Sequence, residues 1–156
     1  MNTIDNLKQL LAEIGPATEE VMIVQQLEAD SWHVLLDENL GIDLDYLEDQ
    51  EKLVLSVELG SPPPDKLAAT YAFLLHYNFI WLQTGCLKMG LDASNGSISM
   101  TFEANASTLD LNNLQSLLTE FAQKALVWRE LITVGFEDDA SSSSEYREMM
   151  PAAIRV

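Results

Sequence analysis

The sequence predicts an α+β domain in which helices flank a twisted antiparallel sheet. Three observations lead to this prediction. Apolar residues recur at helical spacing near both ends of the chain, they alternate with polar residues over short segments between them, and an Asn-Gly pair separates two of the alternating segments. The expected order is α-β-β-β-α-β-β-α. The 156 residues suffice for one hydrophobic core.

The first half of the chain is expected to hold one amphipathic helix and three strands. The helix follows from apolar residues repeating every three or four positions from Ile4 to Ile14, with Thr3 as the N-cap and Gly15-Pro16 as the stop. The strands are Trp32–Asp37, Ile42–Leu47 and Leu53–Leu59. The segment Val21–Leu27 is ambiguous and is left open as a further short strand.

The second half should begin with a helix from Asp65 to about Gln83, after a run of three prolines. Its apolar residues lie all round the axis, so both sides need to be covered. Because one small domain covers one side with its own sheet, we expect a second copy of the chain on the other side, and hence a homodimer.

A β-hairpin and a third helix complete the predicted domain. Leu87–Leu91 and Ile98–Phe102 alternate in hydropathy around the turn Asn95-Gly96. The helix follows Thr108 or Asp110 and ends at Gly135. Its inward stripe repeats at spacings of four and three: Leu114, Leu118, Phe121, Ala125, Trp128 and Ile132. Residues 1–135 are therefore predicted to form the domain, and residues 136–156 an acidic, serine-rich, mobile tail.

Charge narrows the classes of partner. The formal net charge of −17 repels phosphate backbones and anionic lipid surfaces, so neither nucleic acid nor a membrane is expected as a partner. The first eleven residues lack the apolar region of a signal peptide, and the single cysteine, Cys86, suits a reducing compartment. These features predict a cytoplasmic protein.

No catalytic or metal-binding pattern emerges from the sequence. Seven acids lie between Asp37 and Glu51, but aligning Gly41 with the EF-hand glycine places leucines at the first and last ligand positions. The two histidines, His33 and His76, lack zinc-site spacing, and no nucleophile elbow or glycine-rich phosphate loop is present. We therefore expect no enzyme activity, no metal and no cofactor. A hydrolase using the acids between Asp37 and Glu51 with a metal remains an alternative that titration with divalent cations would test.

Several segments in this order resemble the class I type III secretion chaperones of the CesT/SycE kind (Tir chaperone family). The resemblance extends from about Ile4 to Ile132. The segments that carry it are Leu10-Leu11-Ala12-Glu13-Ile14-Gly15, Val34-Leu35-Leu36-Asp37 with Ile42-Asp43-Leu44, Leu74-Leu75-His76-Tyr77-Asn78, Leu87-Lys88-Met89-Gly90-Leu91-Asp92, and Phe121-Ala122 to Trp128-Arg129. Many members have paired glycines where this chain has Thr84-Gly85-Cys86.

The resemblance implies a bacterial, cytoplasmic, ATP-independent homodimer that serves virulence by binding the N-terminal segment of a secreted effector and keeping it soluble and export-competent. A regulatory module of the same fold, acting on a non-secreted partner, is the alternative. The family's dimer-forming region corresponds to the second helix and the strand after it. The interface candidates there are Phe73, Tyr77, Phe79, Ile80, Trp81, Leu87 and Met89.

Effector contacts are sought among apolar residues that face away from the core. Leu35 and Val54 lie opposite the main alternation of their strands, and Trp32 begins a strand. These three residues are the effector-binding candidates. The alternative is that they cover the loops or the first helix of the domain itself.

Overall fold

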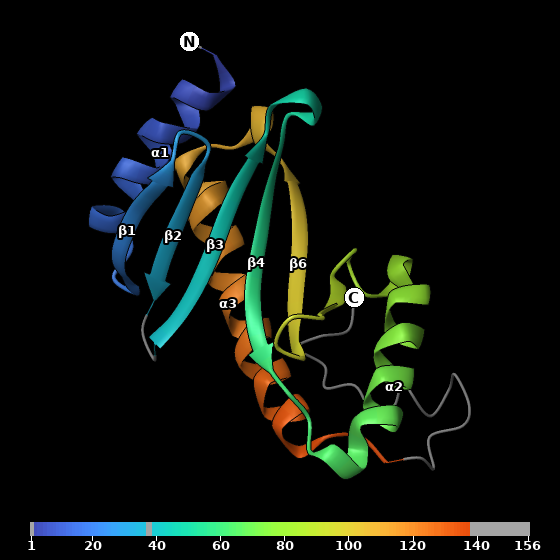
Figure 1. The fold of residues 1–156 in the computed structure, drawn as a ribbon. Helices are drawn as coiled ribbons and strands as arrows, with labels where there is room; N and C mark the ends of the chain where they lie inside the picture. The colour runs from blue at the N-terminus through green and yellow to red at the C-terminus, as the bar shows by residue number, and fades with distance from the viewer. Residues whose placement is uncertain (1, 37–38, 138–156) are drawn as a thin grey trace. The chain divides into compact units, whose positions relative to one another are not determined.

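The computed structural model describes residues 2–36 and 39–137 (Figure 1). Six strands form one antiparallel sheet in the order β1-β2-β3-β4-β6-β5. The elements are α1 (Thr3–Ala17), β1 (Val21–Glu28), β2 (Ser31–Leu36), β3 (Leu40–Leu47), β4 (Lys52–Gly60), α2 (Leu67–Phe79), β5 (Lys88–Asp92), β6 (Ser97–Asn105) and α3 (Leu111–Val134). The predicted α+β class is confirmed, and the ambiguous segment after α1 forms a fourth strand, β1, ahead of α2.

The chain divides into two compact units. The described residues of the first unit are 2–36, 39–57 and 102–123, and those of the second are 58–101 and 124–137. None of the helices within residues 2–36 and 39–137 combines the length and the apolar character that crossing a membrane requires.

The core of the first unit lies on one face of its strands. Every second residue of β2, β3 and the part of β4 up to Val57 is buried, as the period-two alternation predicted. Figure 1 shows α1 and the first half of α3 on this face. The buried residues of α1 are Leu7, Leu10, Leu11 and Ile14. The Asn6 amide of α1 donates to the carbonyl oxygen of Leu109, just before α3, over 3.4 Å.

The ends of α1 differ from the prediction by one or two residues. Asn2, rather than Thr3, is the N-cap, because its Oδ1 accepts the backbone N–H of Asp5 over 2.9 Å. Thr3 instead donates its hydroxyl to the carboxylate of Glu51 over 3.2 Å. The helix also continues through Pro16 and ends at Ala17. A proline in the last turn removes one helical hydrogen bond, and the helix stops directly after it.

An aromatic cluster forms the core of the second unit. Phe73 and Tyr77 of α2 contact Trp128 of α3 edge to face, with ring centroids 6.3 and 4.9 Å apart. Phe136 stacks on Phe73 at 3.9 Å and 11°. Its backbone N–H donates to the buried Thr70 hydroxyl over 3.1 Å. Phe136, the first residue of the predicted tail, is therefore part of this core. Residues 138–156 of the predicted tail lie outside the described residues.

Turn and capping residues determine the hairpin turn and the two ends of α3. The N–H of Gly96 bonds to the Asp92 carbonyl over 2.7 Å, and Gly96 has φ +73°, a conformation that favours glycine. Asp110, rather than Thr108, caps α3, since its Oδ1 accepts the Asn113 N–H over 2.7 Å. Gly135, with φ +78°, ends the helix as predicted. The six stripe residues of α3 are all buried.

Candidate functional site

Strand β1 forms an edge of the sheet and is largely exposed. It is bonded only to β2, so the backbone groups on its outer side are open to another strand. Its large apolar side chains are exposed as well: Met22 by 61%, Ile23 by 53% and Leu27 by 54%. A long apolar edge of this kind favours pairing with a partner chain in extended form.

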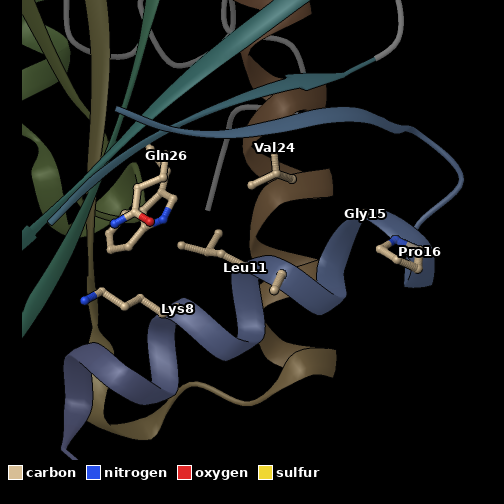
Figure 2. A pocket seen from close by; sticks show the side chains of 8 residues that line it. Lys8, Leu11, Gly15, Pro16, Val24 and Gln26 are labelled. Atoms are coloured by element: carbon tan, nitrogen blue, oxygen red, sulfur yellow. The ribbon is translucent and has the colours of Figure 1, made fainter. Parts of the chain in front are cut away.

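A groove lies in the first unit between α1 and the sheet (Figure 2). Its volume is about 370 Å³. The residues that line this α1–β1 groove are Lys8, Leu11, Ala12, Gly15 and Pro16 of α1, Val24 and Gln26 of β1, and Trp32 of β2. The helix contributes one face, with residues spaced three or four apart, and two of them, Ala12 and Gly15, are small. A Cβ atom added at Gly15 would meet no atom within 4 Å, so the groove is open at this point.

Trp32, one of the three effector-binding candidates, is part of this groove. Its side chain is only 3% exposed and lies on the inward face of β2, together with Val34 and Leu36. The expectation that it is an exposed residue is wrong, because Trp32 alternates in phase with the core residues of its strand. It contributes the floor of the groove rather than a protruding contact.

Leu35 and Val54 lie on the opposite, open face of the sheet and do not line the groove. Both are half-buried. Leu35 is aligned with the exposed Ile23 on β1 and with Gly41 on β3, so it belongs to the rows nearest the edge. Val54 is aligned with Asp45 in a different row, on the fourth strand from that edge. The structure therefore does not bring the three candidates into one surface.

Acidic groups dominate the open face around β3. The Nδ1 atom of His33 lies 2.6 Å from Oδ1 of Asp43, and the imidazole sits over Gly41, where a Cβ atom would come within 2.6 Å of the ring. Burial raises the pKa of Asp45, and nearby carboxylates, Asp43 first, raise it further. The described residues contain no group of three or more histidine, cysteine or acidic side chains placed to hold a metal ion.

A second apolar surface lies in the second unit, on α2 and β5. It includes a hollow of about 220 Å³. The residues lining this α2–β5 hollow are Tyr71, Leu74, Leu75, Asn78, Met89, Gly90, Leu91 and Ile98. The Asn78 side chain ties the two elements together, since it accepts the N–H and donates to the carbonyl of Met89, each over 2.8 Å. Around the hollow, Leu75 is 70% and Leu91 52% exposed.

The seven interface candidates divide into two groups. Phe73 and Tyr77 are enclosed in the aromatic core of the unit, and Leu87 is also buried. Met89 is buried and lines the hollow. Three candidates remain accessible: Phe79 is 80% exposed, Trp81 is 51% exposed and Ile80 is half-buried. Leu75 and Leu91, which line the hollow, are exposed, as is Leu82, and none of the three was among the sequence candidates.

The sequence and the fold were compared with known proteins. The model of the Tir chaperone protein (CesT) family matches residues 6–129. No curated protein matches the chain. Among solved structures, the ExsC–ExsE complex contains a chain that is 23% identical, with a TM-score of 0.70, covering 85% of this chain and 98% of that one.

Two further structures show the same fold. A chain of the HopA1–SchA chaperone–effector complex is 16% identical, with a TM-score of 0.64, and the match covers 83% of this chain and 97% of that one. The Yersinia pestis type III secretion chaperone SycH, in complex with a fragment of YscM2, gives a match that is 17% identical, with a TM-score of 0.58, covering 81% and 99% of the two chains. The fold is thus that of the type III secretion chaperones. The protein belongs to the CesT family, and the resemblance drawn from the sequence is confirmed.

Proposed function

We propose that this protein is a cytoplasmic, homodimeric type III secretion chaperone that binds the N-terminal segment of an effector and keeps it soluble and export-competent without ATP. The observation that carries this proposal is the α1–β1 groove beside the unpaired edge of β1. Family membership and the chaperone–effector complexes with the same fold support it.

The geometry accommodates an extended client. A client strand added to β1 gains backbone hydrogen bonds, and its alternate side chains point to the two faces of the sheet. Side chains on one face enter the groove against Leu11 and Val24, while those on the other lie beside Ile23, which is itself aligned with Leu35 on β2. Because the client orders as it binds, burial of apolar area has to offset its lost entropy, and this exchange needs no nucleotide.

The α2–β5 surface is proposed to bind the second copy of the chain. Exposed leucines border the α2–β5 hollow, and Phe79 at the end of α2 and Trp81 just after it are exposed as well, which is more apolar surface than soluble monomers usually leave uncovered. An interface on it would use Phe79, Trp81 and Leu91 rather than the enclosed Phe73 and Tyr77.

Client capture tests the proposal directly. The chaperone is co-expressed with N-terminal segments of secreted proteins encoded in its native genome, and the complexes are measured by light scattering and protease protection after ATP removal. Gly15→Trp should abolish capture, because the space beside Gly15 is open to a Cβ atom and an indole placed there would occupy the groove. Leu35→Asp should weaken capture, because it puts a charge next to Ile23, the residue of β1 that the added strand would cover.

Val54→Asp is the matched control for Leu35→Asp, since both residues are half-buried on the open face and Val54 lies further from the edge. Normal capture by Gly15→Trp would show that the groove is not the client site. Recovery of a non-secreted protein as the stable partner, with no effector bound, would instead support the regulatory alternative.

A further inference from the structure

We infer that Lys8 makes the α1–β1 groove selective for client segments that carry a carboxylate two residues from the apolar residue buried in the groove. The inference rests on the proposed function and specifies the chemistry of its client. It starts from the charge of the groove lining. Lys8 is the only charged residue among the eight that line the groove, in a chain whose formal net charge is −17.

Lys8 forms no ion pair within the part of the chain that the structure describes. The ion pairs His33–Asp43, Lys52–Glu103 and Lys66–Glu137 do not involve it. Asp5, one helical turn before Lys8, accepts no bond from it. Lys8 is exposed, and Figure 2 shows its side chain extending along the groove wall from α1. Its ammonium group is therefore available to a bound ligand.

The neighbouring polar group does not neutralise this cation. The Gln26 side chain, on the β1 side of the groove, donates to the backbone carbonyls of Glu28 and Ala29 over 2.9 and 3.3 Å. Its Nε2 is thus used within the turn that follows β1, and its uncharged amide oxygen cannot compensate the full charge of Lys8. A client strand that covers the groove would remove water from Lys8 without supplying a partner, unless the client itself brings an acceptor.

The spacing along the groove fixes where that acceptor lies in the client. Lys8 and Ala12 are four residues apart on α1, which corresponds to about 6 Å along the helix axis. Two residues of an extended strand span about 6.6 Å. Consider a client strand that runs along the axis of α1, with one side chain packed against Ala12 and Gly15. The side chain nearest Lys8 is then two positions away in the client sequence, on the same face of the strand. Asp or Glu at that position would form a charge-assisted bond, whereas Lys or Arg would be repelled.

The test selects phage-displayed random 16-residue peptides on the wild-type protein and on Lys8→Glu. Peptides whose binding is lost on Gly15→Trp are taken as groove ligands. On wild type, acids should be enriched two positions from the apolar anchor, and on Lys8→Glu the enrichment should change to Lys and Arg. Lys124→Glu, which makes the same charge change outside the groove lining, should select the same peptides as wild type.

Affinity provides the second measurement. Replacing the selected Asp by Asn in a synthetic peptide should weaken binding about fivefold on wild type and leave it unchanged on Lys8→Gln. Groove ligands with no acid enrichment, or equal losses on both proteins, would overturn the inference and leave the proposed function standing. If Gly15→Trp still binds both the peptides and the effector, the inference and the proposed function are both overturned.

Discussion

Replacing Phe136 by Ala should destabilise the protein substantially, although the residue lies after the last helix and beyond the domain predicted from the sequence. The phenyl ring is 6% exposed and stacks on Phe73 at 3.9 Å. Removing a buried Phe side chain costs about 3 to 5 kcal/mol. Because the ring borders the surface and solvent can enter the space left behind, the lower end of that range, about 3 kcal/mol, applies. In a chain of 156 residues this corresponds to a fall of about 6 to 12 °C in melting temperature.

Urea unfolding followed by circular dichroism measures this change. Phe136→Leu keeps most of the volume but loses the stacked ring, so about 1 kcal/mol should be lost. Val134→Ala is the matched control, because Val134 is two residues earlier in the chain and 64% exposed, and it should change stability by less than about 0.5 kcal/mol. If Phe136→Ala unfolds at the same urea concentration as Val134→Ala, the aromatic cluster does not need Phe136 and the core ends with α3.

Three further predictions concern other parts of the molecule. Trp81→Asp should convert the proposed dimer to a 17.4 kDa monomer in light scattering, because an unpaired charge would be buried at the proposed interface; an unchanged dimer would place that interface elsewhere. Gly41→Ala should cost about 1 kcal/mol in urea unfolding, since its Cβ would lie 2.6 Å from the His33 ring, and no loss would mean that the ring moves freely. Asp45→Asn should raise the melting temperature at pH 7, because burial first and then neighbouring carboxylates raise the pKa of Asp45 in the fold. That gain should shrink as the pH falls through the folded pKa toward the unfolded value of about 3.9, below which the carboxyl is protonated in both states.

Most of the fold could be predicted because the buried residues of most elements repeat at the period of their secondary structure. The strands β2, β3 and β4 alternate between a buried and an open face, so their sequences carry a clear period of two. Strand β1 lacks that signal. Only Val21 is buried in its eight residues, and register shifts at both ends interrupt the alternation. An edge strand of this kind has little core to face, and its pattern is ambiguous for that reason.

The core contribution of Phe136 was missed for a different reason. The polar, serine-rich composition of the segment after Gly135 outweighed one aromatic residue. The contact depends on a chain reversal at Gly135, where φ is +78°, and on the long-range bond from the Phe136 N–H to Thr70. Neither leaves a periodic trace in the sequence. A glycine followed directly by a large apolar residue was the one signal that could have indicated it.

The groove was the least predictable feature, because it is made by residues that look like ordinary helix and core positions. Leu11 follows the apolar period of α1 as expected, and Trp32, which was expected to be exposed, follows the period of the buried residues of β2; such periods cannot distinguish a packed core from the wall of an opening. The groove differs from a packed core in the small size of the residues next to Leu11. Ala12 and Gly15 lie on the same face of α1 as Leu11, and their small side chains leave space that larger ones would fill. Small residues and a lone cation on an otherwise apolar helix face are therefore the sequence signal that could have indicated this groove.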